Sequence, residues 1–227
     1  QLNNESLVLY YMFNNNNYDS SNNNYHAMMH GGKYSNDRFN TLNSSIMLNG
    51  VNEYIETPDL DKITNFNKNW TISFWYYHNS TGVNNYLFSG GDGGSYTKQF
   101  FLTSYIVRLS NSAGTSSDWQ LYITEPNKNM WHMYTATFNT NNGLKIYIDG
   151  KYVNHDSVGG YSDYYPNYRK PLLGARNNGY NKIIDTYFKG KFDDFMVLNK
   201  TLADYEIIQL YSSGINCQEL EGNIDSV

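Results

Sequence analysis

Two adjacent aspartates stand inside an apolar run late in the chain. Residues 188–199 read FKGKFDDFMVLN, so Asp193 and Asp194 have aromatic and aliphatic neighbours on both sides. A carboxylate buried in such a strand costs several kcal/mol unless a partner compensates its charge. Adjacent side chains of a strand point to opposite faces. We therefore expect one of the two to be a ligand, while the other caps a loop or faces water.

A tyrosine-rich segment offers a second kind of chemistry. Residues 159–170 read GGYSDYYPNYRK, in a chain that holds 23 tyrosines. Aromatic rings stack on the apolar faces of sugars, and planar amides and carboxylates bind sugar hydroxyls. Tyrosine and arginine are also enriched in protein interfaces, which leaves a protein partner open. The residues expected to form this contact surface are Tyr161, Asp163, Tyr164, Tyr165, Asn167, Tyr168 and Arg169.

The motifs of common enzymes are lacking. The five histidines are scattered, and neither HExxH, nor a Gly-x-Ser-x-Gly elbow, nor a Walker loop occurs. The acidic stretches IETPDLDK and QELEGNIDS do not form the alternating acidic strand that would place two carboxylates in one glycosidase cleft. His132, within WHMYTATF, is expected to pack or to form hydrogen bonds on one sheet face. We predict no catalytic residue and no enzyme activity.

Composition limits the partners. The chain has 16 Lys and Arg against 21 Asp and Glu, a net charge of -5, and its basic residues are scattered singly along the sequence. This pattern argues against nucleic acid and anionic membranes as partners. No apolar run reaches the roughly 20 residues of a membrane span. Cys217 is the single cysteine, so an internal disulfide is impossible, and the usual Cys/His spacings of metal sites are missing.

The elements that would position these residues are mostly strands. Short runs of alternating apolar and polar residues, separated by Asn, Gly, Ser and Asp clusters, predict an all-β, two-sheet antiparallel β-sandwich of the jelly-roll type. Asp149-Gly150 predicts a tight hairpin turn within LKIYIDGKYVNHD. The runs expected to form strands are 7–13, 44–50, 70–79, 85–90, 99–111, 119–125, 130–139, 144–156, 171–175 and 188–198.

One helix is expected at the end of the domain. The segment TLADYEIIQLYSSG offers Thr201 as its N-terminal cap and Gly214 as its stop. Its apolar face would consist of Leu202, Tyr205, Ile208 and Leu210 or Tyr211. We expect a single domain over residues 1–216 and a polar tail over 217–227. A chain that starts at Gln1 without a signal peptide fits a mature secreted protein or a module of a longer one.

Several segments, in order, resemble the laminin-G-like branch of the concanavalin A-like lectin and glucanase superfamily. The family's opening loop is similar to YDSSNNNYHAMMHGG, and its next passage to NDRFNTLNSSIMLNGVNEYIETP. A central strand and a hairpin are similar to NWTISFWYYH and to MWHMYTATFN with LKIYIDGKYV. The most specific match is the closing segment FKGKFDDFMVLNKTLADYEIIQLY. Two positions depart from the family's pattern: Asn49 stands where Asp is common, and Glu53 replaces the usual Asp or Asn before Tyr54.

The resemblance implies a structural Ca²⁺ that links the amino-terminal loop to the last strand. Calcium takes about six to eight oxygen ligands. By resemblance, Asp19 and Asp193 would bind it through their side chains, with Asn17 or Asn24 contributing oxygens. The alternative is that Asp193 and Asp194 accept hydrogen bonds from backbone N–H groups of neighbouring turns.

The expected function is a non-enzymatic recognition or adhesion module, a lectin, on an extracellular, cell-surface or virion-surface protein. The leading ligand is carbohydrate, on a glycan or glycoprotein surface. The alternatives are a structural or protein-binding coat domain, including one that self-associates, and an atypical glycanase.

Overall fold

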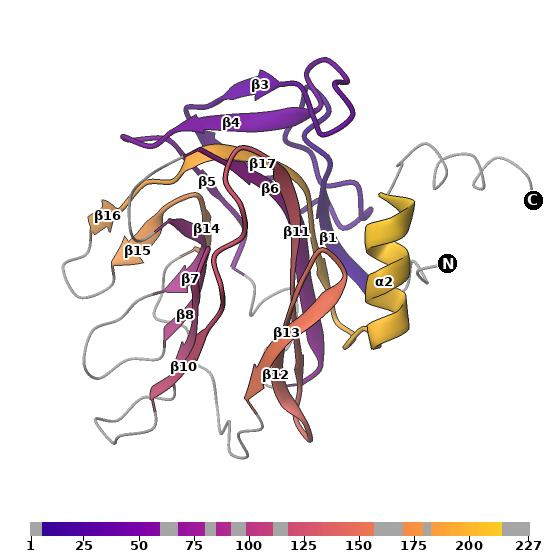
Figure 1. Ribbon diagram of the computed structural model, residues 1–227. Coiled ribbons are helices and arrows are strands. Elements are labelled where there is room, and N and C mark those ends of the chain that lie inside the picture. Colours follow the sequence, from indigo (N-terminus) through magenta and orange to yellow (C-terminus); the bar gives the residue numbers. More distant parts are fainter. Residues whose placement is uncertain are drawn as a thin grey trace, which may run out of the picture.

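The chain folds into two antiparallel sheets that pack face to face (Figure 1). The computed structural model describes residues 6–59, 68–79, 85–91, 99–110, 118–156, 170–178 and 183–214. Within this part, one short helix, α2 (Asp204–Ser213), follows the last strand. The predicted all-β sandwich with a C-terminal helix is therefore confirmed.

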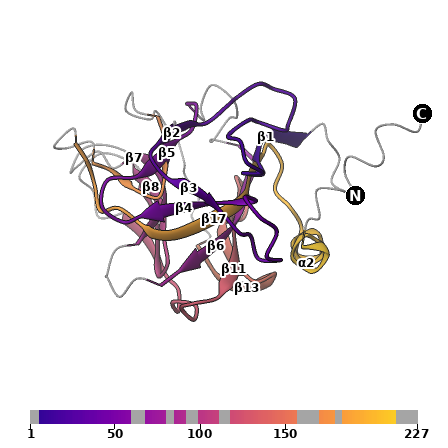
Figure 2. The same cartoon turned by 90° about the horizontal axis from the view of Figure 1, so that it is seen from above.

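Sheet A has eight strands and carries most of the features that follow. Its strands lie side by side in Figure 2, seen from above. In spatial order they are β13 (Lys151–Asp156), β12 (Gly143–Ile148), β11 (Trp131–Asn139), β6 (Trp70–His78), β17 (Lys189–Leu198), β4 (Ser45–Asn49) and β3 (Lys33–Ser35), with β1 (Leu7–Tyr11) paired to β17.

Sheet B has seven strands and forms the other layer. Its order is β10 (Asp118–Tyr122), β9 (Ile106–Ser110), β8 (Gln99–Thr103), β7 (Tyr86–Gly91), β14 (Leu172–Leu173), β5 (Tyr54–Glu56) and β2 (Met28–His30). A separate two-stranded ribbon consists of β15 (Arg176–Asn178) and β16 (Ile183–Asp185).

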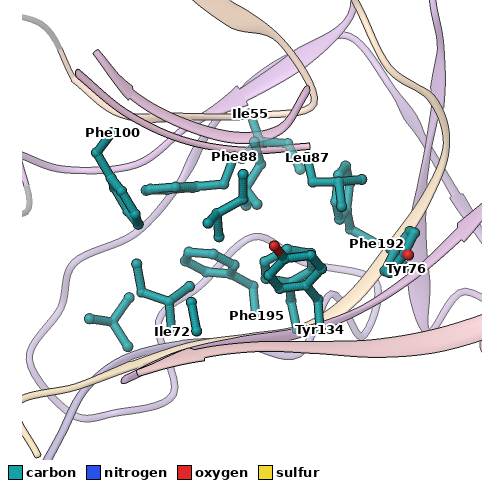
Figure 3. Close-up of a cluster of buried hydrophobic side chains, with 14 of the residues drawn as sticks. Ile55, Ile72, Tyr76, Leu87, Phe88, Phe100, Tyr134, Phe192 and Phe195 are labelled. Carbon is teal, nitrogen blue, oxygen red and sulfur yellow. The ribbon is translucent and has the colours of Figure 1, made fainter. Parts of the chain in front are cut away.

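The core between the sheets is largely aromatic. Figure 3 shows Tyr134, Phe192 and Phe195 of sheet A facing Leu87 and Phe88 of sheet B. All five side chains are fully buried. The ring of Phe195 lies 5.7 Å from that of Phe88, centre to centre, so the two layers are in direct contact through their rings. Burial of such side chains is the main term that holds a sandwich together.

Helix α2 covers part of the outer face of sheet A, the face turned away from sheet B (Figure 1). Its buried residues are Ile207 and Leu210, which join a second apolar cluster with Trp75 and Met133. Because of this cover, β6 is buried on both faces over most of its length. β17 is also buried, except near its start, where Lys189 is exposed and Lys191 half-buried. Helix α2 therefore does not cover the first residues of β17.

The predicted start and apolar face of the helix are partly wrong. The N-terminal cap is Ala203, whose N–H donates to Glu206 Oε2 at 2.8 Å. Thr201 instead donates its hydroxyl to the carbonyl of Phe138, which ties the preceding loop to sheet A. Tyr205 and Ile208 are exposed, so the apolar face is rotated toward Ile207. The predicted stop at Gly214 is confirmed, because this residue is left-handed with φ 47°.

Candidate functional site

The partner of the two aspartates is Arg38. Its Nη1 donates to Asp193 Oδ2 at 2.6 Å and its Nη2 to Asp194 Oδ2 at 2.7 Å. The three side chains are only 4 to 6 % exposed. One guanidinium thus bridges two carboxylates that arrive from 155 residues later in the chain. Charge-assisted hydrogen bonds of this kind are stronger than hydrogen bonds between neutral groups.

Both carboxylates reach Arg38 because the strand is irregular at this point. The register of β17 on β6 shifts between Asp193 and Met196, and Asp194 is left-handed with φ 48°. A bulge of this kind turns a side chain out of the regular alternation. The expectation that the two aspartates point to opposite faces, and do not act together, is therefore wrong.

The surroundings of Arg38 close the cluster. Its guanidinium lies 4.6 Å from the ring centres of both Phe39 and Trp75, and its Nη2 donates to the carbonyl of Gly214 at 3.0 Å. Tyr10 donates its hydroxyl to Asp194 Oδ1 at 2.6 Å. The cluster joins the loop after β3, strands β1 and β17, and the end of α2. Burial, and then the charge of Asp194, raise the pKa of Asp193, while Arg38 opposes this rise.

Asp19 is held by its own loop. Its Oδ1 accepts the N–H groups of Tyr10 and Ser21, both at 2.9 Å. Its Oδ2 accepts the hydroxyl of Ser21 at 2.8 Å and the N–H of Tyr25 at 2.9 Å. Four donors therefore surround a carboxylate that is 8 % exposed. Asparagines with positive φ, such as Asn22 and Asn24, let the chain turn tightly around it.

The residues expected to hold calcium do not form an oxygen cage in the described part of the chain. Asp19 has four protein donors, and Arg38 supplies the positive charge beside Asp193. Asn17 donates its amide to the carbonyl of Ala27, and Asn24 has a positive φ of 60°. Among the described residues, no group of three or more His, Cys, Asp or Glu side chains is placed to bind a metal. Calcium binding stays a prediction.

The tyrosine-rich contact surface predicted from the sequence belongs to the segment between β13 and β14. Its residues, Tyr161, Asp163, Tyr164, Tyr165, Asn167, Tyr168 and Arg169, all lie outside the described residues, as does the polar tail.

His132 confirms the structural role expected for it. The side chain is buried, with Nδ1 2.7 Å from Asp149 Oδ2 and Nε2 2.9 Å from the carbonyl of Asn127. Burial lowers the pKa of His132, but the bonds to Asp149 and Asn127 raise it more, so the net shift is upward. Both neighbours are acceptors, and the protonated ring satisfies both. The predicted hairpin is also confirmed, since Asp149 and Gly150 have positive φ between β12 and β13.

A groove of about 480 Å³ lies on the outer face of sheet A where the cover by α2 ends. The register explains which side chains meet there. Lys33 and Lys191 both pair with Met47, and Lys191 pairs in turn with Tyr77, so one row crosses β3, β4, β17 and β6. Asn49 pairs with Lys189 in a second row. The full lining is Lys33, Met47, Leu48, Asn49, Glu53, Tyr77, Asn79, Lys189, Gly190 and Lys191.

The groove combines an apolar floor with a polar rim. Met47 and Tyr77 supply apolar surface, and the ring of Tyr77 lies 5.9 Å from that of Trp131 on the next strand. The rim carries two amides, three ammonium groups and the carboxylate of Glu53, whose Oε2 accepts the N–H of Asn49 at 2.8 Å. Such a set suits a small polar ligand with apolar C–H faces. Glu53 is the one acidic residue in this lining, so the groove lacks the carboxylate pair of a glycosidase.

Comparison with known proteins agrees with this architecture. The family model described as the concanavalin A-like lectin/glucanases superfamily matches residues 49–208, more than half of the chain. The chain belongs to this superfamily. No curated relative matches the chain in sequence.

Solved structures share the fold at low sequence identity. Domain 4 of AbnA, an extracellular GH43 arabinanase from Geobacillus stearothermophilus in complex with arabinotriose, has a TM-score of 0.70 and 17% identity over 91% of this chain and 98% of that one. Botulinum neurotoxin type C, whose cell entry depends on interaction with two ganglioside molecules, has a TM-score of 0.67 and 18% identity over 92% and 51% of the chains.

A third structure is the binding domain of botulinum neurotoxin DC in complex with rat synaptotagmin II. Its TM-score is 0.65, with 18% identity over 92% of this chain and 52% of that one. This superfamily member thus spans about half the length of the toxin chains and nearly all of the arabinanase domain.

Proposed function

We propose that this superfamily member is a non-enzymatic carbohydrate-recognition module of an extracellular, cell-surface or virion-surface protein. The observation that carries the proposal is the groove on sheet A, with Tyr77 and Met47 in its floor and Asn49 and Asn79 at its rim. In this reading, the apolar side chains contact the C–H faces of a sugar, and the amides bind its hydroxyls.

The comparisons support a binding role. AbnA domain 4 is in complex with arabinotriose, cell entry of botulinum neurotoxin type C depends on two ganglioside molecules, and the binding domain of botulinum neurotoxin DC is in complex with rat synaptotagmin II. These likenesses establish the fold alone, so the ligand class of this chain rests on its own groove.

The test is binding to a glycan array by the intact domain and by two matched variants. Tyr77→Ala removes the ring from the groove. Tyr122→Ala removes a ring that is 66% exposed on β10 of sheet B. We expect glycan binding by the native protein and by Tyr122→Ala, and a loss of tenfold or more in affinity for Tyr77→Ala, on the order of an aromatic stacking contact.

Two results would count against the proposal. Unchanged glycan binding by a folded Tyr77→Ala protein would move the sugar away from this groove. Absence of binding to any glycan by the folded native domain would reject carbohydrate recognition.

A protein partner is the second candidate, because α2 exposes apolar side chains. Tyr205 is 63% and Ile208 53% exposed on the helix, and Phe39 is exposed beside its end, near Gly214. Exposed aromatic and aliphatic groups of this kind mark protein interfaces. A Tyr205→Ala/Ile208→Ala double variant would lose a protein partner while it keeps glycan binding, so the two functions are separable.

A further inference from the structure

The groove on sheet A is basic in an otherwise acidic protein. Lys33, Lys189 and Lys191 line it together with a single carboxylate, that of Glu53, so its formal charge is positive while the whole chain carries -5. The three lysines come from two distant parts of the sequence and meet only through the register of β3, β4 and β17.

The spacing of these lysines follows from sheet geometry. Lys33 on β3 and Lys191 on β17 pair with Met47 from the two sides of β4. Their backbones are therefore two strand spacings apart, which is roughly 10 Å. Lys189 and Lys191 lie on the same face of one strand, roughly 7 Å apart. Long flexible side chains that start from these points can converge on one anionic group in the groove.

Two of the three ammonium groups are available to a ligand. Within the described residues, neither Lys33 nor Lys189 forms an ion pair. Lys191 donates one N–H to the carbonyl of Asn36 at 3.1 Å and lies 5.8 Å from the ring centre of Tyr77, so its charge sits beside the aromatic surface. Glu53 is engaged by the N–H of Asn49.

We infer that the ligand of this groove is an acidic saccharide, one whose ring contacts Met47 and Tyr77 and whose carboxylate or sulfate group lies between the lysines. The inference rests on the proposed function and adds the charge of the sugar to it. A polyanion such as nucleic acid fits less well, because three lysines form a small basic area and the remaining surface of an acidic protein repels a long anionic chain.

The experiment compares matched sugars. The intact domain is titrated with lactose, with sialyllactose, which adds one carboxylated sugar, and with lactose sulfate. A glycan array with neutral, carboxylated and sulfated members widens the choice of core sugar, and a single-stranded oligonucleotide tests for general polyanion binding. We expect acidic glycans to bind at least tenfold more tightly than their neutral counterparts, with an advantage that shrinks as salt is added. The carboxylated and sulfated arms identify the anionic group.

A variant and its control locate the charge. Lys33→Gln/Lys189→Gln removes the two unpaired ammonium groups from the groove, and we expect it to lose most of the preference for acidic sugars, about fivefold per lysine. Lys151→Gln removes an exposed lysine at the far edge of the same sheet, on β13, and we expect it to leave the preference unchanged. Thermal unfolding of both proteins verifies that they fold.

Two outcomes distinguish the preference for acidic sugars from carbohydrate recognition itself. Equal binding of neutral and acidic glycans, unaltered in Lys33→Gln/Lys189→Gln, would overturn the inference and leave carbohydrate recognition in place. Binding of the oligonucleotide without binding of any glycan would overturn both.

Discussion

Arg38 lies at the centre of a buried polar cluster. Its guanidinium bonds to two carboxylates and one carbonyl and lies against two aromatic rings. The sequence indicated that Asp193 and Asp194 need a partner, either a cation or backbone N–H groups, because a buried carboxylate without one is costly. It did not reveal which cation, since Arg38 is 155 residues away and the bulge at Asp194 was not foreseeable from strand alternation.

Loss of Arg38 should be far more damaging than loss of a half-exposed arginine. We expect Arg38→Met to lower the free energy of unfolding by about 3–5 kcal/mol, because it leaves two buried carboxylates without their partner. Arg176→Met is the matched control, since Arg176 is 31% exposed and pairs with Asp185 at 3.9 Å. We expect it to cost about 1 kcal/mol or less. Denaturant unfolding measures both, and equal losses would show that the cluster is not a special source of stability.

His78 should make the protein less stable in mild acid. Burial lowers the pKa of this fully buried side chain below its ordinary value of 6.5, so the unfolded state takes up its proton at a higher pH than the folded state. His78 therefore contributes to stability at a pH above the pKa that it has in the unfolded chain. This contribution is lost as the pH falls below about 6.5. His132, whose folded pKa is raised, acts in the opposite direction.

A comparison with His78→Phe isolates this effect. We expect the free energy of unfolding of the variant to fall less between pH 7 and pH 5 than that of the native protein. The exposed His155 provides a His155→Phe control that should keep the native pH dependence. A parallel fall in all three proteins would assign the acid sensitivity to another group.

At the scale of elements, alternation and turn chemistry predicted the long strands, the Asp149-Gly150 hairpin and the existence of the helix. They missed strands of three residues, such as β2 and β3, which are too short to show a period. They also merged β8 and β9, because apolar residues recur along the whole run 99–111, QFFLTSYIVRLSN. A turn at Ser104 and Tyr105 divides it, and Thr103 Oγ1 accepts the N–H of Ile106 there at 2.8 Å. Local hydrogen bonds of this kind are invisible in a hydrophobic pattern.

Helix α2 offers two neighbouring isoleucines that differ mainly in burial. Ile207 is fully buried against sheet A, and Ile208 is 53% exposed. We expect Ile207→Ala to cost about 2–5 kcal/mol of stability, as buried aliphatic truncations do, and Ile208→Ala to cost less than about 1 kcal/mol. Denaturant unfolding measures both losses. Similar costs for the two would mean that α2 does not pack on the sheet with the face described above.

At the scale of the whole molecule, the candidate groove could not be predicted from the sequence. The basic residues are scattered singly along the chain, and that observation alone argued against a basic surface. The fold nevertheless gathers Lys33, Lys189 and Lys191, because pairing between distant strands decides which side chains become neighbours. Alternation along each strand indicated which residues face outward, but not which outward residues share a row.

Calcium is a question for the whole domain, because the predicted ion would link its first loop to its last strand. The predicted ion requires a higher melting temperature in calcium than in chelator, because a ligand that binds the folded state alone stabilises it. An unchanged melting temperature would leave Asp19 and Asp193 with their protein donors alone. Differential scanning calorimetry measures this, with Asp19→Asn as the comparison. A rise in melting temperature with calcium that Asp19→Asn abolishes would establish the ion.

The central position of β17 in sheet A also has a consequence for synthesis. This strand pairs with β1, β4 and β6, with Leu7 opposite Leu198, yet it is among the last described strands along the chain. A growing chain therefore cannot close sheet A, form the Arg38 cluster or assemble the groove until β17 has left the ribosome. Until then the earlier strands carry unpaired edges, and this high contact order favours slow folding and a need for protection against aggregation during translation.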